Sequence, residues 1–253
     1  MSDPLVFFDV DTDEVLELLT DGEIEVEGRM PHSSNATLLV EVVDPDDADR
    51  RMQAIYKPGR GERPLWDFPP DLYKREAAMY RLAAALGWDV VPPTTIRLGP
   101  FGEGSIQAFV DADFAEHYFT LHEAVADGER DDAALDDLRK LCVLDLLANN
   151  TDRKSGHCLL GRNGRIYGID HGLAFHAQWK LRTVMWDFVG EPIPAPLLEA
   201  VEGALRDGFP AELLCLLDPL ERDALETRAR AVVEAGEFPA DDTDGHRYPW
   251  PLV

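Results

Sequence analysis

Two short stretches of the sequence decide its fold: NNTDRKSGH at residues 149–157 and YGIDHG at residues 167–172. The first follows an apolar run, residues 141–147, and carries Asp152 in a polar loop. The second has strand character and ends in Asp170, two residues before a glycine. One group of phosphoryl-transfer enzymes holds one Asp near the attacking hydroxyl and another on the nucleotide-bound Mg²⁺. The two stretches therefore predict a phosphoryl-transfer site.

Length and composition predict a globular cytoplasmic protein. The chain has 253 residues, 45% of them hydrophobic, which is enough for one large domain or for two lobes that share a cleft. No apolar run approaches the roughly 18 residues that a membrane span needs. The start of the chain, MSDP, is acidic and lacks the basic region of a secretory signal. Three cysteines at unrelated spacings (Cys142, Cys158 and Cys215) indicate reduced thiols, not disulfides.

The net charge of −25 excludes two classes of partner. Such a charge repels the phosphates of nucleic acids and the anionic surface of a cytoplasmic membrane leaflet. We therefore expect neither nucleic-acid binding nor stable membrane association. Solubility is the simplest reason for the charge itself.

Periodicity and turn residues predict an α+β fold of two lobes. The N-lobe, residues 1–110, is expected to be an antiparallel sheet with a main helix at about 71–86 and a short opening helix at 11–19. Its strands are predicted at 23–28, 36–43, 51–57, 94–98 and 105–110. The C-lobe, residues 111–253, is expected to be helical, with helices at 133–147, 196–206 and 210–235 and with catalytic and metal-binding loops at 149–176. The tail, residues 237–253, is expected to pack as an extended segment or to fray.

Lys57 and Glu76 are candidates for a nucleotide-binding pair. Lys57 ends the third predicted strand, and Glu76 lies on the helix that follows it. A carboxylate in that position can hold a lysine against nucleotide phosphates. Taken alone, two solvated side chains would be the commoner outcome.

The order of six motifs gives the chain a family resemblance. They are AIYKP (54–58), KREAAMY (74–80), VPPT (91–94), GSIQAFV (104–110), NTDR (150–153) and IDHGLAF (169–175). In this order the chain resembles the phosphatidylinositol 3-/4-kinase-like family. Its motifs are most similar to those of type II phosphatidylinositol 4-kinases and of uncharacterised actinobacterial-type phosphatidylinositol-kinase-like proteins. The resemblance covers residues 28–176 and implies a two-lobed protein-kinase-like fold that uses ATP and Mg²⁺.

The resemblance also implies a role for each motif residue. Lys57 would contact the α- and β-phosphates with Glu76 as its partner. The strand entering the hinge would contribute Gln107 and, through backbone groups facing adenine, Phe109 and Val110. The turn at 31–36 would cover the phosphates through Ser33, Ser34 and Asn35. Asp152 would orient or deprotonate the acceptor hydroxyl with Arg153 beside it as a second catalytic residue, and Asp170 would bind Mg²⁺.

Two departures from the family pattern affect the metal and the phosphates. The covering turn lacks the expected glycines. His157 stands where the family usually has an Asn that binds a second Mg²⁺. Imidazole suits Zn²⁺ or Mn²⁺ better than Mg²⁺, so His157 is a candidate metal ligand that makes Mn²⁺ use possible. The site would then take one Mg²⁺, or His157 would meet the phosphates as a cation.

The acceptor and several alternatives stay open. The sequence has neither the Cys-rich loop nor the basic amphipathic segment of a lipid kinase, so we expect the hydroxyl of a soluble protein or small molecule as acceptor. A nucleotide-binding pseudokinase and a nucleotidyltransferase would use the same site. A zinc site and an acidic domain whose loop carboxylates only cap turns are further alternatives. The zinc site would use Cys158, His157, His171 and His176.

Overall fold

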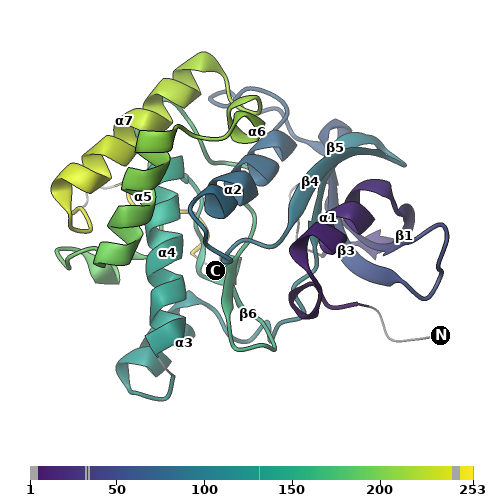
Figure 1. Cartoon of the computed structure of the whole chain (residues 1–253), viewed down its shortest axis with the longest axis horizontal. Coiled ribbons are helices and arrows are strands. Elements are labelled where there is room, and N and C mark those ends of the chain that lie inside the picture. The colour runs from purple at the N-terminus through teal and green to yellow at the C-terminus, as the bar shows by residue number, and fades with distance from the viewer. Residues whose placement is uncertain (1–4, 32, 34, 131, 241–245, 253) are drawn as a thin grey trace. The chain divides into compact units, whose positions relative to one another are not determined.

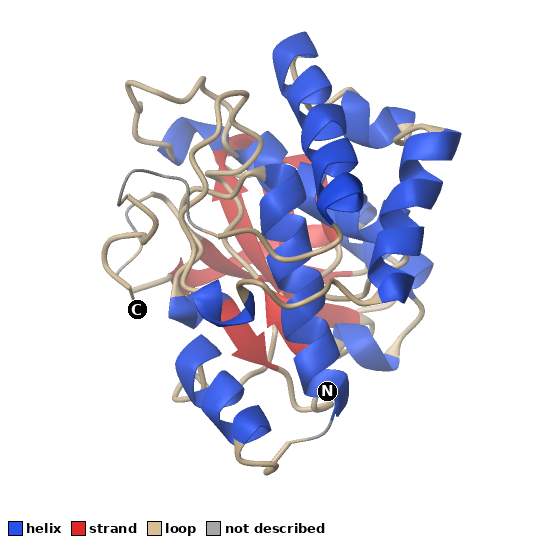
Figure 2. Cartoon of the chain, turned by 90° about the vertical axis from the view of Figure 1, so that its left-hand side faces the viewer, coloured by secondary structure: helices blue, strands red, loops and turns tan. Residues whose placement is uncertain are grey.

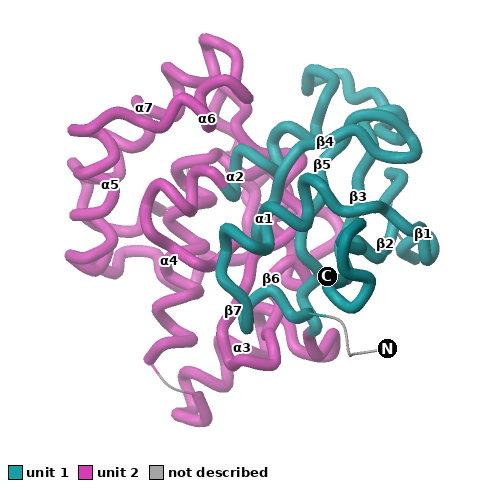
Figure 3. Tube along the Cα trace, turned by 45° about the vertical axis from the view of Figure 1, so that its right-hand side comes forward, with its two compact units in different colours: residues 1–80, 92–111 teal, residues 81–91, 112–253 magenta. Residues whose placement is uncertain are grey.

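The computed structural model describes residues 5–31, 33, 35–130, 132–240 and 246–252. The chain forms two compact units (Figure 3). Unit 1 comprises residues 1–80 and 92–111, and unit 2 comprises residues 81–91 and 112–253. Residues 81–91, which we assigned to the N-lobe with the rest of the main helix, thus belong to unit 2. Strands dominate unit 1 and helices dominate unit 2 by residue number. Figure 2 shows the strands and helices of the chain in separate colours.

Unit 1 is built on a five-stranded antiparallel sheet in the order β1-β2-β3-β5-β4. Its strands are β1 (Glu23–Arg29), β2 (Leu38–Val43), β3 (Arg51–Pro58), β4 (Thr94–Gly99) and β5 (Gly102–Ala108). Each was predicted within a few residues at its ends. The last one ends at Ala108, two residues earlier than expected, although the Phe109 N–H still donates to Gln53 O, its partner in the continued register.

The two faces of the sheet differ because side chains alternate along each strand. Met52, Ala54 and Tyr56 on β3 are fully buried. Helix α1 (Thr12–Asp21) packs against β2, β4 and β5 (Figure 1), and the Asp11 carboxylate caps its first turn. Lys57, at an odd position of β3, points to the opposite face. Strand β3 therefore separates an apolar core from the face that carries Lys57.

Helix α2 (Tyr73–Ala85) supplies Glu76. It ends two residues before Gly87, whose φ of 71° lies in the left-handed region that glycine adopts without strain. This matches the prediction from the sequence.

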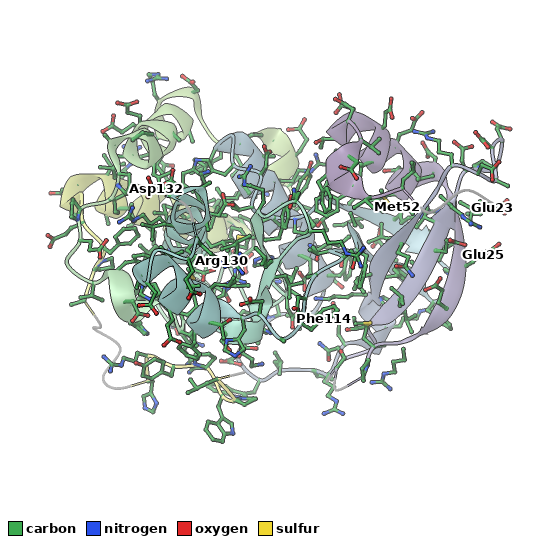
Figure 4. The ribbon with its side chains drawn as sticks, turned by 90° about the horizontal axis from the view of Figure 1, so that it is seen from below. Glu23, Glu25, Met52, Phe114, Arg130 and Asp132 are labelled. Carbon is green, nitrogen blue, oxygen red and sulfur yellow. The ribbon has the colours of Figure 1, made fainter. Side chains whose placement is uncertain are left out.

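The edge of the sheet formed by β1 is acidic. Glu23, Glu25 and Glu27 on β1 are exposed, and the first two are marked in Figure 4. Charged side chains on an edge strand oppose pairing with another chain. These three carboxylates therefore favour solubility over pairing with another chain.

Unit 2 contains the remaining helices, α3 (Tyr118–Ala126), α4 (Asp132–Ala148), α5 (Ala195–Asp207), α6 (Ala211–Leu214) and α7 (Pro219–Ala235). The helix predicted over residues 210–235 is wrong, since Pro219 starts a new helix whose first turn is capped by Asp218 and Glu221. Helix α3 was not predicted. Short 3₁₀ turns lie at Phe7–Asp9, Gly59–Gly61, Ser155–His157 and Trp186–Phe188.

The centre of unit 2 is α4 and a small hairpin. Every residue of α4 from Leu141 onward is buried, including the carboxylate of Asp145. The hairpin consists of β6 (Cys158–Leu160) and β7 (Ile166–Gly168), and β7 packs on α4. Within the described ranges, no helix is both long and apolar enough to cross a membrane.

Candidate active site

Lys57 and Glu76 form an ion pair within unit 1. Lys57 Nζ lies 2.5 Å from Glu76 Oε1, and the Glu76 side chain is only 4% exposed against 21% for Lys57. The buried carboxylate fixes the direction of the lysine side chain. The ammonium group keeps some solvent access and can meet an anion.

The turn between β1 and β2 uses its polar groups internally. Ser33 Oγ lies 2.6 Å from Thr37 Oγ1 and 3.0 Å from Asn35 O. Asn35 Oδ1 accepts a hydrogen bond from Arg63 N–H at 3.0 Å. Ser34 lies outside the described residues. The side-chain oxygens of Ser33 and Asn35 therefore already have partners within the protein.

The groups predicted to face adenine also have partners inside unit 1. Gln107 Nε2 donates to Thr94 Oγ1 at 2.8 Å, and Gln107 is 7% exposed. The Phe109 N–H donates to Gln53 O at 3.0 Å. Val110 is buried. A nucleotide contact at Phe109 would thus have to use its carbonyl oxygen, because its N–H already has an acceptor.

Asp152 lies in the loop after α4, within unit 2. Its backbone N–H donates to Asn150 Oδ1 at 3.1 Å, and Asn150 Nδ2 donates to the buried Asp145 at 2.9 Å. The carboxylate of Asp152 accepts from Lys154 Nζ at 2.8 Å. Burial raises the pKa of Asp152 above its ordinary value, and the hydrogen bond from Lys154 opposes that rise. The carboxylate is thus placed at the end of a rigid turn.

Lys154 was missed by the sequence interpretation. Its position two residues after Asp152 was the available signal. The alternation of the loop puts Arg153 inside and leaves Asp152 and Lys154 partly exposed, 22% and 20%. The pair gives the loop one proton acceptor and one cation on the same side.

Arg153 does not match its predicted role as a catalytic residue. It is 0% exposed, and its guanidinium forms a two-point contact with Asp145, Nε to Oδ2 at 2.8 Å and Nη2 to Oδ1 at 2.9 Å. A fully buried side chain cannot touch a substrate. We therefore correct the prediction: Arg153 acts behind the site.

Asp170 stands just beyond β7 with a φ of 57°, a left-handed conformation that Asp tolerates better than most residues. Its side chain is 52% exposed. The Ile169 N–H donates to His157 O at 3.0 Å. This bond connects the residue before Asp170 to the end of the loop that carries Asp152. The carboxylate is thus fixed by its backbone and open to a ligand.

The orientation of His157 argues against metal binding. His157 Nδ1 accepts from the Lys154 N–H at 3.4 Å, and Nε2 lies 3.5 Å from Asp170 Oδ2. A neutral imidazole that accepts at Nδ1 carries its proton on Nε2, and a protonated nitrogen cannot bind a metal. His157 thus lies beside Asp170, with Nε2 facing its carboxylate.

The zinc alternative has no support in the structure. Among the residues described, no three His, Cys, Asp or Glu side chains gather in a way that could hold a metal ion. Cys158 is fully buried, and His171 Nε2 contacts Arg153.

Comparison with known proteins shows the family and the fold. No family model matches the chain. Protein Rv2133c of Mycobacterium tuberculosis is 40% identical, over 92% of this chain and 94% of that protein. The chain belongs to the same family as Rv2133c. That name carries no activity, so the relationship identifies relatives and not a function.

The structure of hydra Fam20 with sugar is similar to this chain with a TM-score of 0.52. The two are 15% identical, and the match covers 90% of this chain and 89% of that one. The crystal structure of the Golgi casein kinase matches at a TM-score of 0.48, 17% identity and 88% and 73% coverage, too weakly to carry an argument. The predicted α+β, protein-kinase-like fold is confirmed. The finer resemblance to phosphatidylinositol 4-kinases stays a prediction.

Proposed function

We propose that this protein is an ATP- and Mg²⁺-dependent phosphotransferase of the phosphatidylinositol-kinase-like group, acting on a hydroxyl of a soluble protein or small molecule. The observation that carries the proposal is the pair of carboxylates in unit 2. Asp152 ends a rigid turn with a lysine beside it, and Asp170 is fixed in the left-handed region and exposed. One can accept a proton and the other can bind a cation.

The two carboxylates suit a divalent cation. The negative charge of Asp170 contributes to raising the pKa of Asp152, after burial, so the two groups repel each other. A dication bound by Asp170 would relieve that repulsion, and hard carboxylate oxygens suit Mg²⁺ or Mn²⁺. When bound, the cation would neutralise charge on the phosphate oxygens of the nucleotide.

The local charge favours a polyanionic ligand. Residues 148–186 contain six basic residues (Arg153, Lys154, Arg162, Arg165, Lys180 and Arg182) and two acidic ones (Asp152 and Asp170), a net charge of +4. The rest of the chain therefore has a net charge of −29, which together with +4 gives the total of −25. Arg153 and Arg165 are paired with carboxylates of α4 outside this segment, so its remaining four basic and two acidic residues leave a net charge of +2. These basic side chains and the Lys57–Glu76 pair of unit 1 support phosphate binding.

Asp152 is the residue we assign to the acceptor. Its carboxylate would orient the hydroxyl and take its proton as the new phosphate ester forms. The net charge supports an acceptor other than nucleic acid, and a cytoplasmic location is part of the proposal.

The orientation of His157 favours a second candidate, a protein that binds nucleotide without turnover. The nitrogen expected to help bind a second metal instead faces Asp170. Nucleotidyl transfer, which would use the same residues, differs only in the bond that breaks.

Thermal unfolding with ATP tests the proposal. Wild type should be stabilised by ATP with Mg²⁺ or Mn²⁺ more than by ATP alone, and Asp170→Asn should lose the metal-dependent part. Asp223→Asn, an exposed carboxylate on α7, is the matched control and should respond as wild type does. If metal adds nothing to the effect of ATP on wild type, the proposal is wrong.

A second measurement separates an enzyme from a binding protein. Wild type should hydrolyse ATP slowly, and Asp152→Ala should lower that rate by about 100-fold or more, the usual contribution of a positioned proton acceptor. Equal rates in both would leave a nucleotide-binding protein. The mass of a modified acceptor would distinguish a phosphoryl from a nucleotidyl group.

A further inference from the structure

The buried side chain of Arg153 uses all of its hydrogen-bond donors. A guanidinium has five N–H groups. Two donate to Asp145, as described above, and two on Nη1 donate to the carbonyl oxygens of His157 and Ile169, both at 3.1 Å. The fifth, on Nη2, points to His171 Nε2 at 2.7 Å. No donor remains for a substrate.

The acceptors lie on both sides of Asp170. Ile169 precedes Asp170 and His171 follows it, while Asp152 is the direct neighbour of Arg153 in the chain. One side chain therefore touches the backbone segments that carry both candidate carboxylates. Asp145 anchors that side chain to α4, the most buried helix of unit 2.

The charge of Arg153 is secure in this position. Burial by itself lowers the pKa of a guanidinium, but the charge and hydrogen bonds of Asp145 outweigh it and raise the pKa of Arg153. The guanidinium must then donate to His171 Nε2, so the neutral imidazole carries its proton on Nδ1. This tautomer lets the Arg153–His171 contact form as a hydrogen bond.

We infer that Asp145, Arg153 and His171 form a positioning cluster that sets the geometry of Asp152 and Asp170. The inference rests on the proposed function for the roles of Asp152 and Asp170. The contacts that position their backbone do not depend on that function. Asp145 and His171 are new to the site, and neither touches a substrate. Their effect passes through the backbone on either side of Asp170.

The competing explanation is an ordinary buried ion pair that only stabilises unit 2. The same helix offers such a pair for comparison. Asp137 on α4 binds Arg165 at two points, 2.7 Å and 2.8 Å, and also accepts from the Ile166 N–H. Asp137→Asn therefore removes a similar pair from α4, one that holds the start of β7 at Ile166 and makes no contact with Arg153.

Amide hydrogen exchange of Ile169 is the direct readout, since its N–H donates to His157 O beside the guanidinium. Arg153→Lys keeps the charge but cannot reproduce five fixed donors. We expect the exchange rate of the Ile169 amide in Arg153→Lys to be about tenfold that of wild type. Each rate is divided by the global unfolding rate measured on the same sample. Asp145→Asn should act in the same direction, and Asp137→Asn should leave Ile169 within threefold of wild type.

The Mg²⁺ concentration that half-saturates ATP-dependent thermal stabilisation is the second readout. It should rise about tenfold in Arg153→Lys and stay within threefold in Asp137→Asn. His171 gives a test that does not depend on replacing Arg153. In His171→Gln the Oε1 atom can accept from Arg153, so near wild-type behaviour is expected, whereas His171→Leu should act like Arg153→Lys.

The outcomes are distinguishable. Equal exchange and equal metal dependence in Arg153→Lys and Asp137→Asn would overturn the inference, as would equal behaviour of His171→Gln and His171→Leu. If wild type shows no metal-dependent ATP binding, the proposed function fails, and exchange at Ile169 still decides whether the cluster holds these segments. If Arg153→Lys does not fold, the two His171 variants decide.

Discussion

At the scale of single residues, the ion pair of Asp152 and Lys154 determines when the proposed proton acceptor is ionised. Burial favours the neutral carboxyl, and the lysine favours the carboxylate. The two effects act in opposite directions on one pKa. The balance between them should be visible in the pH dependence of turnover.

Replacing Lys154 with Met should move the acidic limb of the rate profile to higher pH. Lys154 lowers the pKa of Asp152, so its removal raises that pKa further. Asp152 accepts a proton only when ionised, and activity is lost as pH falls through its pKa. The measurement is ATP hydrolysis against pH, with Lys140→Met on α4 as a control that should keep the wild-type limb. A limb that stays in place in Lys154→Met would remove Asp152 from the role of proton acceptor.

At the scale of elements, β7 must approach α4 closely to place Asp170. A Cβ on Gly168 would lie 2.5 Å from Leu141 Cδ2 and 3.4 Å from Arg153 Nη1. A Cβ at this point would force the buried Leu141 side chain to shift. The short strand thus has a packing requirement that its three residues alone do not reveal.

Gly168→Ala should destabilise the protein by about 1–3 kcal/mol, the usual effect of overpacking a core. At about 2–4 °C per kcal/mol for a protein of this size, the melting temperature should fall by several degrees. Gly156→Ala is the control, because a Cβ there meets nothing within 4 Å. Thermal unfolding of both variants tests the packing, and a similar small change in the two would show that α4 and β7 can separate without penalty.

At the scale of the whole molecule, the C-terminal segment closes onto the candidate active-site loops of unit 2. Arg247 O accepts from Thr183 N–H at 3.0 Å and from Trp186 Nε1 at 3.1 Å. Leu252 O accepts from the Ser155 N–H at 2.8 Å, three residues beyond Asp152. Residues 246–252 form no helix or strand, and Pro249 among them is buried.

Deletion of residues 246–253 should loosen these loops. The Ser155 and Thr183 amides lose their acceptors, so their hydrogen exchange should quicken about tenfold, and turnover should fall. Trp250→Ala is the control, since the Trp250 side chain is 89% exposed and the backbone acceptors remain. Unchanged exchange, or a rise in turnover on deletion, would contradict a supporting role for the segment.

Elements that depend on neighbouring residues were predicted from the sequence better than elements that depend on distant contacts. Strands and helices were predicted well where alternation, a cap or a stop residue marked them, as at Gly87. The helix predicted over 210–235 failed because a proline that begins a helix was taken as part of a longer one. The short helix α3 carried too weak a periodic signal to be predicted.

The sequence by itself determined the order of the motifs and the distribution of charge, with basic residues in excess at 148–186. It also identified Lys57, Asp152 and Asp170 as site candidates, because each lies in a motif formed by its neighbours along the chain. Only the tertiary structure decided what Arg153, His157, Gln107 and Gly168 do. Their roles depend on burial and on partners that folding brings from other segments. Arg153 shows the reason most clearly. Its place beside Asp152 in the sequence is typical of a catalytic residue, but in the structure its side chain is buried and paired with Asp145 on the preceding helix α4.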